Sequence, residues 1–249
     1  MLVQLPNGLI DGADHFNFVE IGELLGRHQN YLADKELVVG NIGHVEKLVA
    51  ELIESIQTQS GLKWKGDKKQ LPWLLTTTDI ETILIKIREN TYGDRFYFNA
   101  YCDHCDHLNK DIKISLESLK VTPISIEEMV KPKITMLPKK QVEAELKDIY
   151  LKDQLKIIEL SKGKGDKLIT SVVAVTLKRI GDNTNITEEL IGDIPVKDIL
   201  HIQKFMEDMP EGSIDTEIEH GCSGCKKDFT VKLNAFDPGF FDPSKDTPT

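Results

Sequence analysis

Cys102-Asp103-His104-Cys105 returns near the other end of the chain as Cys222-Ser223-Gly224-Cys225. These two pairs hold the only four cysteines among 249 residues, and the second pair follows the first by 120 positions (222 − 102 = 225 − 105 = 120). Two thiolates separated by two residues on a tight turn can both lie about 2.3 Å from one zinc ion. The pattern therefore predicts one structural zinc ion per chain, with Cys102, Cys105, Cys222 and Cys225 as its ligands.

Three other interpretations of the cysteines stay open: a redox-active dithiol, two local disulfides, and four unrelated thiols. A reactive dithiol is favoured where one pair begins a helix, but residues typical of strands flank both pairs here. His104, His107 and His220 lie near the cysteines in the sequence and are alternative ligands. Four thiolates leave no open position for substrate or water, so the spacing predicts a metal that holds the fold and does no chemistry.

The composition is that of an ordinary globular protein, with 40% hydrophobic and 29% charged residues. No run of about 18 apolar residues is present, so we expect no membrane-spanning helix, and the N-terminus carries no recognisable signal peptide. Cysteines in metal-type spacing fit a reducing cytosol. The net charge of −10 and pI near 5.2 disfavour binding to a phosphate backbone, where affinity comes from Lys and Arg.

The first half of the chain begins with an expected hairpin of residues 2–5 and 15–21, joined by a wide loop that starts with the turn signal Pro6-Asn7-Gly8. Apolar residues at helical spacing predict helices over residues 23–33 and 43–57. A capping box at residues 78–81 predicts the start of a third helix. An aromatic strand, residues 96–101, then leads into the first cysteine pair, and residues 112–116 alternate on the way out.

The second half repeats this order of elements. Strands are expected at residues 134–137 and 142–146, and helices at 150–160, 168–180 and 196–205, before alternating residues lead into the second cysteine pair. The predicted fold is α+β with two pseudo-repeated halves. Each half has a β-hairpin, a group of helices and a zinc-ribbon-like CxxC hairpin, and one shared zinc site joins the halves. The predicted boundaries are 1–120 for the N-terminal repeat, 121–132 for a linker, 133–235 for the C-terminal repeat and 236–249 for a tail.

No combination of residues in the sequence indicates an enzyme. His15, His28, His44 and His201 share no spacing, and the acidic residues show no pattern that separates a general acid–base pair from a helix surface. The lysine- and glycine-rich residues 161–167 lack the order of a phosphate-binding loop. The basic residues 63–69 are interpreted as a solvated loop.

The C-terminal segment has two open interpretations. Phe236, Phe240 and Phe241 lie within six residues, among prolines that prevent regular secondary structure. The three rings either fold back onto the cysteine hairpins as a local core or dock into a groove of a partner protein. We take Phe236, Phe240 and Phe241 as candidate partner-binding residues.

These motifs, taken together and in order, resemble the baseplate hub assembly chaperones and hub subunits of T-even-like phages, a family also found in contractile injection systems. The resemblance covers essentially the whole chain, and departs from the family's usual Cys-Pro-x-Cys-Gly knuckle at the proline and glycine positions. Asp103 and Ser223 replace the proline, and Asp106 and Lys226 replace the glycine. The motifs that carry the resemblance are Leu5-Pro6 with Gly8, Tyr92-Gly93-Asp94, the two cysteine pairs, and Pro238-Gly239-Phe240-Phe241-Asp242-Pro243.

The resemblance implies a non-enzymatic tail-assembly protein, either a chaperone or a hub subunit. Its partners would be baseplate hub or other tail proteins, with no nucleic acid and no membrane. It would act in the cytoplasm of the host bacterium during assembly, and as a hub subunit it would stay in the virion tail. The alternative from the residues alone is a zinc-ribbon module that binds nucleic acid or regulates transcription.

Overall fold

The computed structural model describes residues 1–28, 42–161 and 168–246. The chain divides into two compact units. Unit 1 comprises Met1–Pro72, Thr78–Pro123 and Gly212–Thr249, and unit 2 comprises Trp73–Thr77 and Ile124–Glu211. Within the described ranges, no helix is both long enough and apolar enough to span a bilayer.

Unit 1 begins with a three-stranded antiparallel sheet in the order β1-β2-β3. β1 (Leu2–Asp11) and β2 (Asp14–Ile21) form the predicted hairpin, and β3 (Ile53–Gln57) pairs with the other edge of β2. The loop of this hairpin is shorter than the wide loop predicted between residues 5 and 15, because β1 continues to Asp11. Pro6-Asn7-Gly8 is an irregularity inside β1, and the chain reverses at residues 12–13, where Gly12 has a φ of 63°.

The helix predicted over residues 43–57 is in fact a helix followed by a strand. α2 (Ile42–Leu52) runs without a break into β3. The strand carries a bulge, because Ile21 pairs with Ile53 whereas Glu20 pairs with Ser55. The extra residue lets Ile53 and Ile56 both be buried although they are three positions apart. A bulged strand thus imitates the apolar spacing of a helix, which is why the sequence pattern misleads here.

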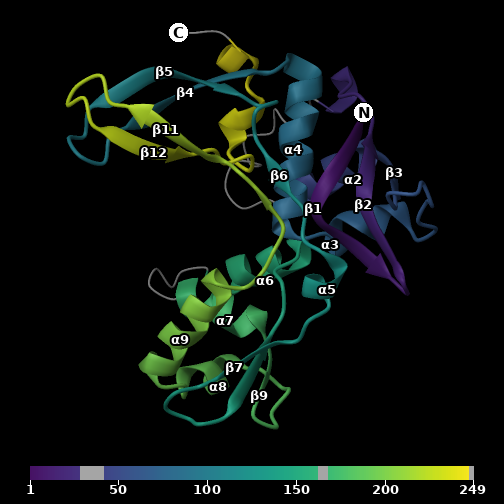
Figure 1. Ribbon diagram of the computed structural model, residues 1–249, viewed down its shortest axis with the longest axis vertical. Helices are drawn as coiled ribbons and strands as arrows, with labels where there is room; N and C mark the ends of the chain where they lie inside the picture. The colour runs from purple at the N-terminus through teal and green to yellow at the C-terminus, as the bar shows by residue number, and fades with distance from the viewer. Residues whose placement is uncertain (29–41, 162–167, 247–249) are drawn as a thin grey trace. The chain divides into compact units, whose positions relative to one another are not determined.

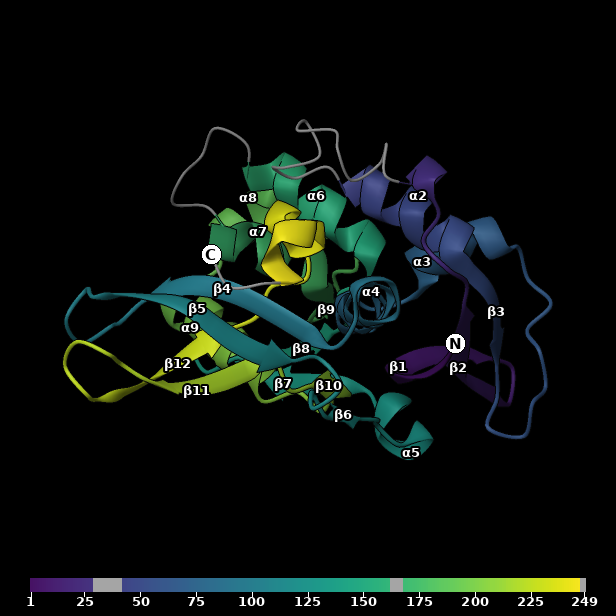
Figure 2. The same cartoon turned by 90° about the horizontal axis from the view of Figure 1, so that it is seen from above.

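The rest of unit 1 carries both cysteine pairs. α4 (Thr77–Tyr92) begins one residue before the predicted capping box, and its apolar face includes the fully buried Ile80, Ile83 and Ile87. β4 (Arg95–Tyr101) and β5 (Leu108–Ser115) form one antiparallel hairpin, and β11 (Glu217–Gly221) and β12 (Asp228–Lys232) form another. The two hairpins lie side by side in both views (Figure 1 and Figure 2).

Two short strands and two 3-10 turns also belong to the described part of unit 1. β6 (Val121–Thr122) pairs with β10 (Ser213–Ile214), so the chain leaves for residues 124–211 and returns through one antiparallel pair. η5 (Pro238–Phe241) and η6 (Pro243–Asp246) follow the second hairpin. The remaining short elements are η1 (Gly26–His28), η3 (Lys68–Gln70) and α3 (Leu71–Leu74), the last of which crosses the boundary between the units.

Unit 2 contains a second three-stranded antiparallel sheet, in the order β7-β8-β9. Its strands are β7 (Lys133–Met136), β8 (Glu143–Leu146) and β9 (Leu177–Ile180), and its helices are α5 (Ile126–Met129), α6 (Leu151–Ser161), α7 (Leu168–Thr176), α8 (Glu188–Gly192) and α9 (Val196–Glu207). Buried Leu146, Val173 and Ile202 form part of its core. The helix predicted over residues 168–180 also ends early, because α7 runs directly into β9.

The predicted mixture of helices and strands is confirmed, and the repeat boundaries stay a prediction. Two other predictions fall partly on residues that the structure does not describe. Of the helix expected over residues 23–33, residues 29–33 lie outside the described residues, and the described part contains only the 3-10 turn η1. Residues 162–167 of the lysine- and glycine-rich loop also lie outside them.

Candidate metal centre

Each cysteine pair sits on the turn of its hairpin, and the two turns have the same hydrogen bonds. The Cys102 carbonyl accepts from the N–H of Asp106 at 2.9 Å, and the Cys222 carbonyl accepts from the N–H of Lys226 at 3.0 Å. The Cys102 N–H donates to His107 at 3.0 Å, and the Cys222 N–H donates to Lys227 at 2.9 Å. These bonds turn the chain so tightly that the two sulfurs of each pair face the same side.

The residue after each second cysteine adopts a left-handed backbone conformation. Asp106 has a φ of 53° and Lys226 a φ of 64°. These are the two positions where the family pattern has glycine, which adopts such a φ without steric cost. The knuckle geometry is therefore kept although the glycine is absent, at a conformational cost of about 1 kcal/mol per residue.

The two hairpins bring all four sulfurs into one cluster. The Sγ atoms of Cys102 and Cys225 lie 3.8 Å apart, and those of Cys105 and Cys222 lie 3.7 Å apart. All four sulfurs lie within 4.8 Å of one another. Ligands about 2.3 Å from a tetrahedral zinc ion are roughly 3.8 Å from each other. The arrangement therefore fits a four-sulfur metal site built from two segments 120 residues apart.

The distances also bear on the alternative interpretations of the cysteines. All four cysteines are free, and sulfurs about 3.7 Å apart are far beyond the roughly 2.05 Å of a disulfide bond. Cys102 and Cys222 are 0% and 1% exposed, Cys225 is half-buried and Cys105 is exposed. Cys102 and Cys222 pack with Ile112 and Phe229 in a small core between the hairpins. This core can exclude water from one side of the sulfur cluster.

The three nearby histidines bind other groups in the structure. His104 Nε2 lies 3.1 Å from the Asp228 carbonyl oxygen, and His107 Nε2 lies 2.9 Å from the Ser223 hydroxyl. The His220 ring packs edge-on against the Phe229 ring, with ring centroids 5.7 Å apart. Among the described residues, the cluster able to hold a metal consists of the four cysteines alone.

Burial and neighbouring groups shift the pKa values of Cys102, Cys105 and Cys222 in different directions. Burial opposes ionisation of Cys222, but the N–H of Cys225 and the Asn109 amide bond its sulfur and lower its pKa to about 5. Burial raises the pKa of Cys102. Although an N–H from His107 favours its thiolate, Cys105 has a pKa raised to about 12 by the adjacent Cys225 sulfur and by burial. The cluster thus favours the thiolate of Cys222 and disfavours the thiolates of Cys102 and Cys105, and a bound divalent cation would favour the thiolate form of its ligands.

The candidate partner-binding rings are mostly buried in unit 1. Phe240 and Phe241 are 1% and 9% exposed, and Phe236 is half-buried. The Phe240 ring packs edge-on against Phe96, with centroids 5.2 Å apart. The first of the two interpretations, in which rings fold back as a local core, therefore describes Phe240 and Phe241 in this structure. Their role in partner binding stays a prediction.

Sequence reasoning missed the residue that anchors this segment, Arg88. Its side chain is fully buried, and its guanidinium donates to the Phe240 carbonyl and lies over the Phe96 ring at 4.7 Å. The signal was present in the sequence, because Arg88 falls four residues after Leu84 on the apolar face of α4. A charged residue in that stripe indicates a buried partner that completes its hydrogen bonds.

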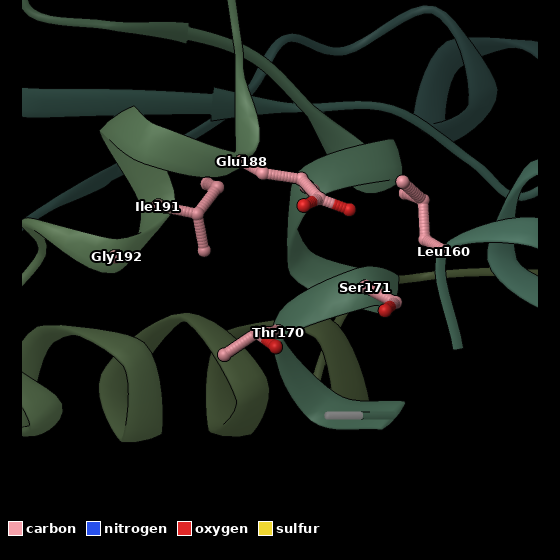
Figure 3. A pocket seen from close by; sticks show the side chains of 7 residues that line it. Leu160, Thr170, Ser171, Glu188, Ile191 and Gly192 are labelled. Atoms are coloured by element: carbon pink, nitrogen blue, oxygen red, sulfur yellow. The ribbon is translucent and has the colours of Figure 1, made fainter. Parts of the chain in front are cut away.

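Unit 2 contains a cavity of about 190 Å³ between α6, α7 and α8. Figure 3 shows Leu160, Thr170, Ser171, Glu188 and Ile191 around it. Among the described residues that line this cavity, Glu188 is the one titratable side chain. The described residues that line the cavity therefore offer two hydroxyl groups and one carboxylate, and include no histidine, cysteine or lysine.

Two cysteine hairpins thus meet around one cluster of sulfurs that could hold a metal ion. A family model described as T4 bacteriophage base plate protein matches residues 35–241. The chain belongs to this family of T4-like phage baseplate proteins, which confirms the resemblance found in the sequence. No curated protein and no solved structure matches the chain.

Proposed function

We propose that this chain is a non-enzymatic assembly protein of the baseplate hub, acting as a chaperone or as a hub subunit, with its fold held by a structural zinc ion. Membership of the baseplate family supports a role in the phage tail. The observation that carries the proposal is the four-sulfur cluster, in which two distant segments meet at tetrahedral spacing. Its partners would be hub or other tail proteins.

Zinc is the metal that best suits the donor set. A tetrahedral set of four thiolates is typical of zinc or of iron–sulfur centres, and all four cysteines would be ligands of one ion. An ion bound by all four would close a loop of 116 residues between Cys105 and Cys222 (222 − 105 − 1 = 116), which restricts the unfolded chain. Because no ligand position remains open, the ion would stabilise the fold only.

We also propose that the chain arose by internal duplication, on the basis of features that recur in the two sheets. The bulge of β3 on β2 recurs where β9 pairs with β8, because Leu146 pairs with Leu177 whereas Glu145 pairs with Arg179. In both cases a helix runs directly into the bulged strand. The carbonyl of the last helical residue accepts from the residue after the middle strand, Gly22 N–H to Leu52 at 2.8 Å and Lys147 N–H to Thr176 at 2.9 Å.

The test of the function is quantitative mass spectrometry of this chain in purified finished tails and in tail-assembly intermediates. A fixed copy number in finished tails is expected for a hub subunit, and enrichment in intermediates with absence from finished tails is expected for a chaperone. Absence from both would contradict the proposal and favour the nucleic-acid alternative. A gel-shift with random DNA and RNA at about 50 mM salt, where electrostatic binding is strongest, would then test that alternative.

The role of the aromatic segment in partner binding can be separated from its role in the fold. Phe240→Ala should lower the stability by about 3–5 kcal/mol, because it empties a buried site next to Arg88. The Phe236 ring is half-buried, so Phe236→Ala should leave the melting temperature nearly unchanged. Because part of the ring is exposed to a partner, the variant should weaken capture of hub proteins from tail intermediates. Equal capture by Phe236→Ala and the wild type would contradict a binding role for this ring.

A further inference from the structure

Asn109 is a buried polar residue in a row of apolar ones. It lies on β5 opposite Ala100, its side chain is 2% exposed, and Ile112 and Ile114 follow it into the core. The residue at the corresponding place in the second hairpin, also seven positions after the first cysteine, is Phe229, which is buried in the small core between the hairpins. Burying an amide where an aromatic ring would pack is unfavourable unless its hydrogen bonds are made.

The hydrogen bonds of Asn109 are directed at the other cysteine pair. Its Nδ2 donates to the Cys222 sulfur at 3.6 Å and to the His107 carbonyl at 3.1 Å. Its Oδ1 accepts from the N–H and from the hydroxyl of Ser223, at 2.8 Å and 3.0 Å. Both amide protons and the carbonyl oxygen are therefore used. The Ser223 N–H also fixes the amide orientation, because the rotated amide would point a donor at a donor.

Two neighbouring contacts also join side chains of the first cysteine hairpin to groups of the second. His107 Nε2 lies 2.9 Å from the Ser223 hydroxyl, and His104 Nε2 lies 3.1 Å from the Asp228 carbonyl. A Cβ on Gly224 would lie 2.8 Å from the His107 ring, so the second turn fits closely under the first. Side chains of the first hairpin thus position both the backbone of the second hairpin and the sulfur of Cys222.

We propose that Asn109 is a positioning residue of the metal centre, which orients the Cys222 sulfur and sets the register between the two cysteine turns. This inference rests on the proposed zinc site and adds to it a residue outside the ligand set. By donating to a ligand sulfur and holding the next backbone N–H, Asn109 fixes both the side chain and the turn that present Cys222. Residues that orient metal ligands in this way typically change metal affinity by about 10–100-fold when removed.

The experiment uses the full-length, zinc-loaded chain with Asn109→Ala, Asn109→Asp and the control Asn99→Ala. Asn99 lies on the same hairpin, is exposed and accepts a hydrogen bond from the Asp111 N–H, away from the sulfurs. The measurements are zinc content by elemental analysis, the rate of zinc release to excess 4-(2-pyridylazo)resorcinol, and the visible absorption of the cobalt(II)-substituted protein. A residue with only a packing role would not alter the cobalt spectrum.

Asn109→Ala should release zinc about 10–100-fold faster than the wild type and shift the sulfur-to-cobalt absorption, whereas Asn99→Ala should match the wild type. Asn109→Asp keeps the shape and the acceptor but turns a carboxylate oxygen toward the sulfur, so it should release zinc at least as fast as Asn109→Ala. It also decides the question if Asn109→Ala does not fold. Wild-type release rates and spectra in both variants would overturn the inference alone. A wild-type chain without bound metal would contradict the proposed zinc site and the inference with it.

Discussion

Each unit contains an interaction that we call a clasp, in which an aspartate at the start of a helix accepts hydrogen bonds from two backbone N–H groups of a β-hairpin. The two clasps have the same hydrogen bonds but differ in sequence and in burial. In unit 1 the Asp79 carboxylate, in the first turn of α4, accepts from the N–H groups of Asn7 and Gly8 at 2.8 and 3.1 Å. In unit 2 the Asp198 carboxylate, in the first turn of α9, accepts from the N–H groups of Lys139 and Lys140 at 2.7 and 2.9 Å. Both carboxylates are fully buried.

The sequences of the clasped segments show what the clasp requires. Leu-Pro precedes the two donors in each unit, as Leu5-Pro6 and as Leu137-Pro138. The first clasp has Gly8 with a φ of 72°, and the second has Lys140 at the same place. The clasp therefore requires only two backbone donors and one carboxylate at a helix start, where the helix dipole favours negative charge. The hydrogen bonds of the clasp do not require glycine, so Gly8 is required only by the surroundings of the first clasp.

Those surroundings differ in burial. Asn7 is 4% exposed, and its Oδ1 accepts from the Gly212 N–H at 2.8 Å, at the point where the chain re-enters unit 1. Lys139 and Lys140 are exposed. The clasp of unit 1 thus fixes a chain crossing inside the fold, whereas that of unit 2 closes a surface turn. The same hydrogen bonds should contribute more to stability where their donors cannot reach water.

The largest difference is expected between Asp79→Ala and Asp198→Ala. Asp79→Ala should lower the free energy of unfolding by about 3 kcal/mol, because two buried N–H groups lose their acceptor. Asp198→Ala should lower it by about 1 kcal/mol, because Lys139 and Lys140 are exposed, so water can reach their N–H groups once the carboxylate is removed. Urea unfolding and hydrogen exchange at residues 7, 8, 139 and 140 measure the two effects. Equal losses of stability would contradict the distinction between a buried and a surface clasp.

A smaller difference should separate Gly8→Ala from Lys140→Ala. A Cβ on Gly8 would lie 2.5 Å from the Phe16 carbonyl oxygen, at a φ that disfavours side chains, so Gly8→Ala should cost about 2 kcal/mol. Lys140→Ala alters an exposed side chain and should change stability by less than about 0.5 kcal/mol. Thermal unfolding of both variants tests this. An unchanged melting temperature in Gly8→Ala would mean that glycine is as dispensable in the first clasp as in the second.

The smallest effect is expected at the cysteine turns, where the two hairpins share one departure from the family pattern. Lys226→Gly and Asp106→Gly should each raise the stability of the metal-loaded chain, by at most about 1 kcal/mol, because both positions have a left-handed backbone. The melting temperature at fixed zinc concentration measures the gain. A loss of stability in both variants would show that the side chains contribute more than the strain costs.

The sequence predicts the cluster of four cysteines better than the sheets around it. Four cysteines at matched spacing between strand-like residues are a local signal, and the structure brings those four sulfurs together. The strands after α2 and α7 were predicted as helix, because a bulge places Ile53 with Ile56, and Leu177 with Ile180, on one buried side at a spacing of three. The clasps could not be predicted from the sequence, because Asp79 is 72 residues from Asn7 and resembles an ordinary helix cap.

The most direct test of the account is the metal content of the purified chain and of two single variants, one in each hairpin, by native mass spectrometry and elemental analysis. We expect one zinc per wild-type chain, and its loss in Cys102→Ser and in Cys222→Ser alike, because each removes one of four shared ligands and leaves an incomplete site. Retention of a full zinc equivalent by either variant, or a wild-type chain free of metal, would contradict a site shared between the two hairpins.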